Sequence, residues 1–249
     1  MSFFRLMFLS IFSILIALST PVLSQEPGWS DYRAILKQYV KPGVRNGVRV
    51  NLVDYTGIGR DRRWQKVLNK LAKYPEHKLR TKNERAAFYI NAYNIMTIQL
   101  VVKNWPLKSI RDIGSFFSPV WKKKAGLVAG KMVSLSDIGQ RKLRPLGDIR
   151  SYFALACGST SCPDLRRQPY TARSLNGQLH SQTRNFLSNR GKGLVQSRNQ
   201  VRVSKLFSWF EHDFNRYGGV RAFVKRYKAI PERLTLSADL PYHWSINGS

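Results

Sequence analysis

Cys157 is the residue of this sequence whose type and setting best fit covalent chemistry. It follows an apolar run from Tyr152 to Ala156, which predicts a buried strand, and it precedes Gly158. A glycine lets a substrate approach the backbone, and amide groups of the following loop can hold an oxyanion. A thiol at the end of a strand in such a loop is typical of a cysteine nucleophile.

Two other states of this cysteine fit the same residues. Four residues separate Cys157 from Cys162, a spacing that permits a disulfide. A buried, unreactive thiol is the third alternative, because free cysteines are common in protein cores. The sequence leaves the three open. The spacing is not Cys-x-x-Cys, so it does not predict a thioredoxin-like motif.

A cysteine nucleophile normally works with a base, usually a histidine brought near it by the fold. The sequence holds four histidines: His77, His180, His212 and His243. Nothing in their positions along the chain assigns one of them to Cys157.

Three polar residues, Glu84, Asn91 and Asn94, lie on a helix that is apolar on nearly every side. Thr81 and Glu84 fit a capping box, so the helix is expected to begin there. At about 100° per residue the three polar side chains share one face. They form either an internal hydrogen-bond network or one wall of a site, and Glu84 has its cap as a further role.

The composition is strongly basic, with 42 Lys and Arg against 14 Asp and Glu and a formal net charge of +28. Hydrophobic residues make up 43%, which excludes wholesale disorder. Two cysteines are too few for a disulfide framework or a Cys-rich zinc site, and carboxylates are scarce, so we expect no metal and no cofactor.

Basic residues are spread over the chain without a zinc-finger, helix-turn-helix or phosphate-loop pattern. Nucleic acid is therefore not expected as the main partner. Two interpretations of the basic surface stay open: it is a solvated surface without a specific partner, or it associates with anionic envelope polymers or lipid head groups in a salt-dependent way.

Residues 1–24 are typical of a secretory signal peptide, with Arg5 before an apolar run that is too short to span a membrane. We therefore expect an exported protein, periplasmic or secreted, in an oxidising compartment. Residues 25–249 show no linker or repeat and are expected to form a single domain.

Helix and strand patterns alternate irregularly, which predicts an α+β fold. Helices are expected over residues 30–40, 61–74, 81–102, 171–187, 206–217 and 219–227, and a short one after 134. Strands are expected over 48–52, 152–156 and 201–203, and a hairpin at 127–133 about the turn Ala129-Gly130-Lys131.

Several ordered segments resemble the domain-of-unknown-function family 547, found in bacterial secreted proteins and in plants. They are Val53–Tyr55, Ala87–Asn94, Ser134–Ile138, Phe153–Gly158, Ser161–Pro163, Pro169–Ala172, Gln178–Leu179, Phe207–Phe210 with Asp213–Phe214, and Trp244–Asn247. The helix that begins at Thr81 is apolar on nearly every side, so we expect a central buried helix packed on a small antiparallel sheet. The resemblance implies a papain-like or transglutaminase-like core. It also implies acyl-transfer chemistry at Cys157, with Glu84, Asn91 and Asn94 at the family's polar helix positions.

The sequence departs from the family's pattern at several positions. The family usually has His where this chain has Tyr152, Glu-His where it has Gly139-Gln140, and Asp where it has His243. Tyrosine, with a pKa near 10, is a poor base at neutral pH. The family also often has Cys, and sometimes Ser, at the position of Cys162, which argues against an obligatory disulfide.

Two functions follow as hypotheses. The first is an exported thiol-dependent hydrolase or acyltransferase acting on amide or ester bonds, with Cys157 as nucleophile and Glu84, Asn91 and Asn94 orienting groups. The alternative is a non-catalytic, strongly basic cell-envelope module that binds an anionic polymer or a partner protein.

Overall fold

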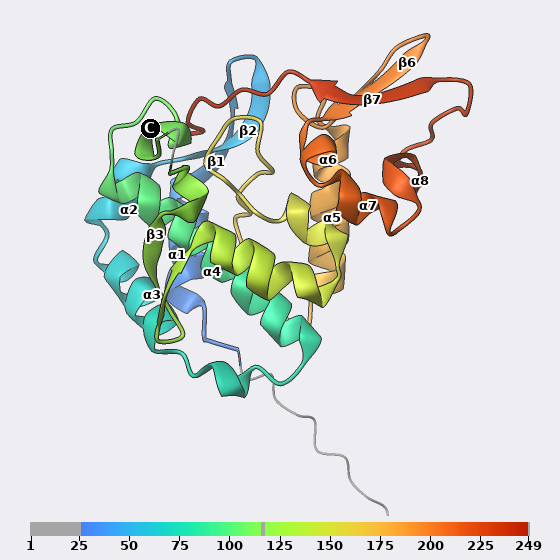
Figure 1. The fold of residues 1–249 in the computed structure, drawn as a ribbon. Helices are drawn as coiled ribbons and strands as arrows, with labels where there is room; N and C mark the ends of the chain where they lie inside the picture. Colours follow the sequence, from blue (N-terminus) through green and yellow to red (C-terminus); the bar gives the residue numbers. More distant parts are fainter. Residues whose placement is uncertain (1–25, 116–117, 249) are drawn as a thin grey trace, which may run out of the picture.

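A computed structural model describes residues 26–115 and 118–248 as a mixed α and β fold (Figure 1). The predicted signal peptide, residues 1–24, lies outside the described residues. The predicted α+β class is confirmed. Among the described residues no helix combines the length and the apolar character needed to cross a membrane.

The first half of the chain is a layer of helices around one hairpin. Its elements are α1 (Ser30–Tyr39), β1 (Val40–Arg45), β2 (Val48–Val53), α2 (Tyr55–Arg60), α3 (Arg62–Lys73) and α4 (Lys82–Lys103). The strands β1 and β2 pair antiparallel around a turn at Asn46-Gly47. The expected helices at 30–40 and 61–74 and the strand at 48–52 are confirmed to within two residues.

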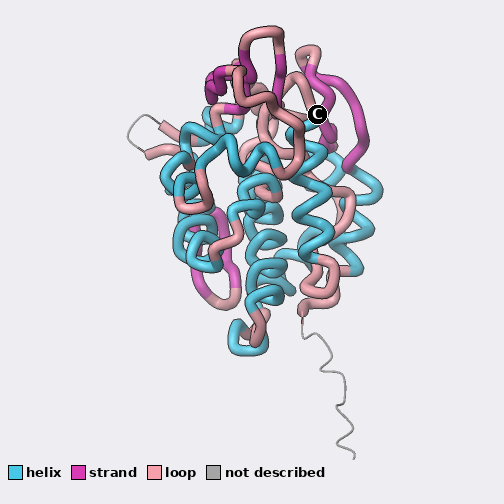
Figure 2. Tube along the Cα trace, turned by 90° about the vertical axis from the view of Figure 1, so that its right-hand side faces the viewer, coloured by secondary structure: helices cyan, strands magenta, loops and turns pink. Residues whose placement is uncertain are grey.

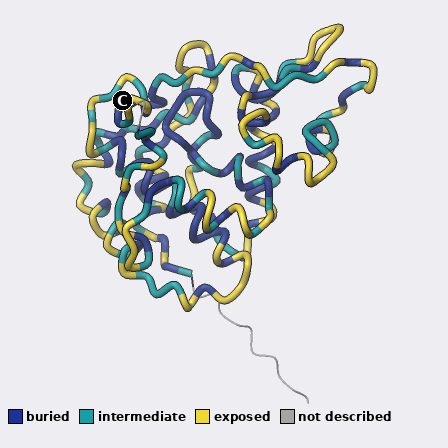
Figure 3. Tube along the Cα trace, in the orientation of Figure 1, coloured by how far each residue is buried: buried dark blue, intermediate teal, exposed yellow. Residues whose placement is uncertain are grey.

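Helix α4 is the central element, and buried residues gather along it (Figures 1 and 3). The capping box is present: the Thr81 hydroxyl accepts the amide of Glu84, and the Glu84 carboxylate accepts the amide of Thr81. These bonds satisfy amides that the first turn of a helix leaves without partners, so the helix begins where the sequence predicts.

The expected hairpin is β3 (Lys124–Val128) and β4 (Lys131–Ser134), turning at Ala129 and Gly130 with positive φ at both. It packs on α4 so closely that a Cβ at Gly126 would lie 2.8 Å from the Met96 sulfur. A π-helix, Asp137–Leu143, follows. The central helix therefore does pack on an antiparallel pair, as expected.

The last third of the chain combines short helices with a three-stranded sheet. Its elements are α5 (Leu175–Ser188), β5 (Leu194–Gln196), β6 (Gln200–Ser204), α6 (Leu206–Trp209), α7 (Glu211–Asn215), α8 (Gly219–Lys225) and β7 (Thr235–Leu240). Strand β6 pairs antiparallel with β5 and parallel with β7, so this sheet is mixed rather than antiparallel. Figure 2 shows the strands at the periphery of a largely helical body.

Buried side chains form two hydrophobic clusters. The larger surrounds α4 and includes Phe88, Ile95 and Leu135, whereas the smaller joins α5 to the C-terminal helices through Phe153, Phe207 and other aromatic side chains. The chain passes from one cluster to the other close to Phe153, just before the two cysteines.

The predicted strand at 152–156 is wrong. Residues Ile149–Phe153 form a 3-10 helix, which Asp148 caps by accepting the amide of Arg150, and the chain then runs irregularly to Cys157. The run is buried, as its composition implies, but a short apolar run has no periodicity that separates strand from helix. The expected helix at 206–217 likewise divides into α6 and α7 at Phe210, and α5 begins at Leu175 instead of near 171.

Candidate functional site

A cavity of about 1010 Å³ lies between the two hydrophobic clusters. Side chains of both clusters line it, from Leu135 and Val120 on one side and Leu206 on the other. Cys157 and Cys162 also line it. A large concave site with mostly apolar walls and a few polar groups is where a ligand site is expected in an uncharacterised protein.

The two cysteines form a disulfide, with their Cα atoms 5.8 Å apart. Of the three alternatives that the sequence leaves open, the structure has this one. Cys157 is 8% exposed and Cys162 is 3% exposed. In this state Cys157 carries no free sulfur, so the thiol chemistry assigned to it stays a prediction for the reduced chain.

Hydroxyl groups lie against the two sulfur atoms of the disulfide. The Tyr242 hydroxyl lies 3.1 Å from the Cys162 sulfur and 3.6 Å from that of Cys157, and the Ser159 hydroxyl lies 3.3 Å from Cys157. Burial raises the pKa of Tyr242 to about 12, so this phenol is protonated at neutral pH.

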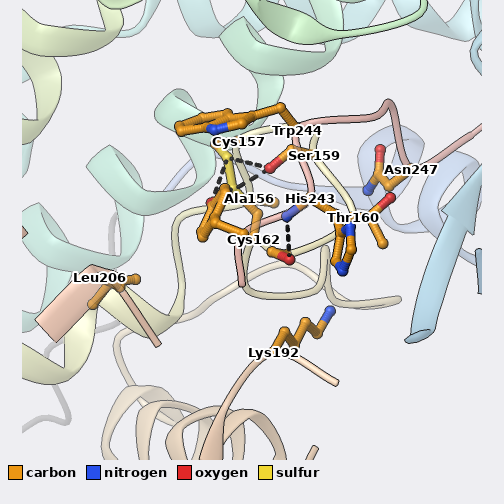
Figure 4. The surroundings of a disulfide bond; sticks show 12 residues. Ala156, Cys157, Ser159, Thr160, Cys162, Lys192, Leu206, His243, Trp244 and Asn247 are labelled. Carbon is orange, nitrogen blue, oxygen red and sulfur yellow. Dashed lines mark hydrogen bonds between the residues drawn. A yellow bond between two sulfur atoms is a disulfide. The ribbon is translucent and has the colours of Figure 1, made fainter. Parts of the chain in front are cut away.

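None of the four histidines, all of which lie in the described part of the chain, lines the cavity. His243 is the histidine nearest in sequence to Tyr242. Its backbone amide donates to the Ser161 hydroxyl at 2.9 Å, and Figure 4 shows its ring turned away from the disulfide. No histidine of the described residues therefore stands beside Cys157 in the cavity lining.

Asn94 holds the backbone that leads into Cys157. Its amide group donates to the carbonyl of Ala154 at 3.0 Å, and its oxygen accepts the amide of Ala156 at 2.9 Å. Both contacts are buried. The carboxamide thus replaces the backbone partners that this irregular segment lacks.

Asn91 does the same for a second segment, since its carboxamide exchanges two hydrogen bonds with the backbone of Tyr170, at 2.8 and 2.9 Å. The structure therefore uses both asparagines as an internal hydrogen-bond network that fixes loops. A catalytic role for either stays a prediction.

Glu84 lies apart from the other predicted site residues. It precedes Asn94 by ten positions, or about 15 Å along the helix axis, and it does not line the cavity. Its carboxylate accepts the amides of Arg80 and Thr81 at 3.0 and 2.8 Å. The structure thus brings Cys157 and Asn94 close through the backbone at Ala156. It places Glu84 at the N-terminal end of α4, away from both.

The loop between the cysteines forms backbone hydrogen bonds with the C-terminal segment. The amide of Thr160 donates to Ser245 and that of Asn247 to Gly158, at 2.8 and 3.0 Å. Farther along, the Tyr55 hydroxyl donates to the Asn247 side chain at 2.8 Å. After β7 the chain therefore crosses the molecule to reach α2 and the β1–β2 hairpin (Figure 1).

This segment brings two aromatic side chains, Tyr242 and Trp244, to the cavity wall, where they meet Trp209 of α6. The rings of Trp209 and Trp244 are stacked, with centroids 5.5 Å apart and 25° between planes. The centroid of the Tyr242 ring lies 4.8 Å from that of Trp209 and 4.5 Å from that of Trp244. We call Trp209, Tyr242 and Trp244 the aromatic wall.

Sequence reasoning missed this wall. Trp209 is 48% exposed, which is unusual for so large an apolar side chain. The available signal was the density of aromatic residues in the segments around 207–210 and 242–244. Nothing local in the sequence says that these distant segments meet.

A cation lies at the edge of the wall. The Arg111 guanidinium sits 5.3 Å from the centre of the Trp244 ring, within the range of a cation–π contact. Arg111 lines the cavity and makes no ion pair within the described residues. Its neighbour Asp112 also lines the cavity, where its carboxylate accepts the amide of Ser109 at 2.9 Å.

Residues 77–187 match the sequence model of a family described as "Protein of unknown function, DUF547". The chain therefore contains a region of this family over residues 77–187. The matched range contains α4, the π-helix and both cysteines, so it covers the disulfide side of the cavity. No curated protein and no solved structure matches the chain.

Gly139, Gln140 and Tyr152, three of the positions where the resemblance implies other residues, all line this cavity. Tyr152 stacks on Phe210 with centroids 4.1 Å apart and donates a hydrogen bond to Asp213. Burial and the bond to Asp213 raise the pKa of Tyr152, so it cannot accept a proton at neutral pH.

Asp213 itself is held by Arg144 at 2.7 Å. Burial raises the pKa of Asp213, but the hydrogen bonds from Tyr152 and Arg144 outweigh it and lower the pKa overall. This carboxylate is therefore ionised, and both of its oxygens accept hydrogen bonds from Arg144 or Tyr152. No group of three or more His, Cys, Asp or Glu in the described part of the DUF547 protein is arranged to hold a metal ion.

Proposed function

We propose that this DUF547 protein is a non-catalytic, exported binding module that holds an anionic polymer at the cavity between its two hydrophobic clusters. One observation carries the proposal: the cavity combines the aromatic wall with the Arg111 guanidinium, while Cys157 in its lining is bonded to Cys162. Such a site has the apolar surface and the charge that binding needs, and it offers no free thiol at Cys157 in this state.

The thiol-hydrolase hypothesis requires a free sulfur and a base. Cys157 is bonded to Cys162, and Tyr152 stands where the family usually has His. The hydrolase or acyltransferase activity, and the papain-like or transglutaminase-like core, remain expectations that come from the resemblance alone.

Charge supports an anionic partner. The formal net charge is +28, and Lys122 and Lys123 directly follow Trp121, another residue of the cavity lining. A surface of one sign raises the local concentration of oppositely charged polymer and speeds its association. The disulfide supports an oxidising, extracytoplasmic location.

The test measures retention of the purified protein on immobilised dextran sulfate, alginate and polyphosphate as salt is raised. We expect binding that weakens steadily with salt, because it releases counterions. Lys122→Glu with Lys123→Glu should weaken it most, since these lysines directly follow Trp121, a residue of the cavity lining. The matched control is Lys37→Glu with Lys66→Glu, two lysines on α1 and α3 that have no neighbour in sequence among the lining residues.

Equal losses from the two lysine pairs would overturn a polymer site at the cavity, as would retention on none of the three polymers. Stronger binding to anionic vesicles or duplex DNA would replace the polymer with another partner. Iodoacetamide at pH 7 without reductant should leave the protein unlabelled, and labelling of Cys157 would contradict the non-catalytic assignment.

A further inference from the structure

We infer that the cavity takes sugar rings of a carboxylate-bearing polysaccharide, one ring lying against the aromatic wall and its carboxylate against Arg111. This inference rests on the proposed function and names the chemistry of the polymer. Trp209, Tyr242, Trp244 and Arg111 carry it.

The aromatic wall gathers three apolar ring systems at the cavity. The rings of Trp209 and Trp244 are stacked, and Tyr242 is tilted against both of them. Rings of this kind provide large rigid contact areas at a small cost in conformational entropy. Trp209 lines the cavity and is half-exposed, so part of this side chain is accessible to a ligand.

A pyranose ring matches such a surface, because aliphatic C–H groups cover its faces and hydroxyl groups surround its edge. The cavity also offers partners for that edge. Within the described residues the Ser136 hydroxyl has no hydrogen-bond partner, and Gln140 uses only its oxygen, which accepts from Arg144. Their free donors can bind ring hydroxyls without breaking a bond of the protein.

Arg111 gives the site its preference for an acid. Its guanidinium has a planar set of donors that fits a carboxylate, and the described residues place no carboxylate within ion-pair distance of it. The nearest acidic neighbour in sequence, Asp112, is held by the Ser109 amide as a helix cap. A ligand carboxylate would therefore add a charge-assisted bond at the edge of the wall.

Other anionic chains fit less well. Polyphosphate has no ring face to lie on the aromatic wall. Peptides that dock on aromatic-lined grooves do so as proline-rich extended segments, whereas a sugar ring needs only the apolar ring surface that α6 and the segment after β7 provide here.

The experiment measures dissociation constants by titration calorimetry for oligomers of alginate, polygalacturonate and hyaluronan. Neutral dextran oligomers, polyglutamate and polyphosphate serve as comparison ligands. We expect a polyuronate or hyaluronan to bind best. Trp209→Ala should weaken that binding at least about tenfold and leave polyphosphate unchanged.

Arg111→Gln should weaken binding of the acidic oligomer by about tenfold and leave the weaker binding of dextran unchanged. The matched aromatic control is Tyr217→Ala, which removes an exposed ring that does not line the cavity. Far-ultraviolet circular dichroism checks that the variants keep their fold, which the exposure of Trp209 and Arg111 favours.

The outcomes separate the two claims. If polyphosphate binds as well as every acidic oligosaccharide, and Trp209→Ala changes neither, the sugar inference is overturned while polymer binding stands. Tightest binding to polyglutamate replaces the sugar with an acidic peptide. If no anionic ligand binds, the proposed function fails together with the inference.

Discussion

The side-chain oxygen of Asn94, on the central helix, accepts the backbone amide of Ala156 at 2.9 Å, one residue before Cys157. Helix and disulfide loop are therefore joined by a buried hydrogen bond, and the same carboxamide binds Ala154. The disulfide loop in turn binds the C-terminal segment, which carries Tyr242 and Trp244 of the aromatic wall. The central helix therefore holds the cavity wall in place through buried hydrogen bonds.

We expect Asn94→Leu to destabilise the protein by about 2–4 kcal/mol, because it leaves a buried amide and a buried carbonyl without partners. Urea unfolding measures the change. Asn69→Leu on the exposed face of α3 is the control and should shift the free energy of unfolding by less than about 0.5 kcal/mol. Equal effects from the two variants would show that the Asn94 contacts contribute nothing specific.

The double variant Cys157→Ser with Cys162→Ser should lose about 2 kcal/mol of stability, as expected for opening a short covalent loop. We expect the C-terminal segment that binds the disulfide loop to become less stable against local opening. Hydrogen exchange should accelerate at the amides of Thr160 and Asn247, which pair the loop with that segment, and not in the middle of α4. Unchanged exchange at both amides would mean that the segment docks independently of the disulfide.

The buried Lys192 side chain forms an ion pair with Asp164 at 2.7 Å, close after Cys162 in the chain. Burial lowers the pKa of Lys192, and Asp164 acts in the opposite direction. Asp164→Asn should therefore cost about 3–5 kcal/mol at pH 7, since it leaves a buried charge without a partner. Adding Lys192→Met should restore a large part, and a double variant no more stable than the single one would refute this reason.

Stability should fall in acid through Asp61, which caps α3 and is bound by Arg63 and Tyr39. Hydrogen bonding to Arg63 lowers the pKa of Asp61 from 3.8 to about 2. Because the folded pKa is the lower one, the stabilisation is complete above pH 4 and is lost as pH falls toward 2.

Asp61→Asn should thus cost on the order of 1–2 kcal/mol at pH 6 and much less at pH 2. Urea midpoints of the two proteins at both pH values give the comparison. A difference that stays constant with pH would assign the effect to the cap geometry instead of the charge.

Local signals in the sequence predict much of this fold. The capping box of Thr81 and Glu84, the turn at Ala129 and Gly130, and the periodicity of α3 each depend on residues within a few positions of one another, and each is confirmed. The run before Cys157 fails as a strand because its burial comes from tertiary packing of Phe153 and not from pairing.

The site was harder to predict because it is assembled from distant segments. The pairing of Cys157 with Cys162 is local and was one of the open alternatives. The meeting of Trp209 with Trp244, and of the cysteine loop with Ser245, depends on contacts across long stretches of chain. The polar face shared by Asn91 and Asn94 was recognised, but both bind backbone instead of facing the cavity.

The most direct test of a ligand site at the aromatic wall is a nuclear magnetic resonance titration that follows the indole N–H signals of the six tryptophans during addition of an acidic oligosaccharide. The account predicts saturable shifts for Trp209, Trp244 and Trp121, which line the cavity, and none for Trp29 and Trp64, which are buried elsewhere. Saturable binding that leaves the three cavity signals unmoved would contradict it.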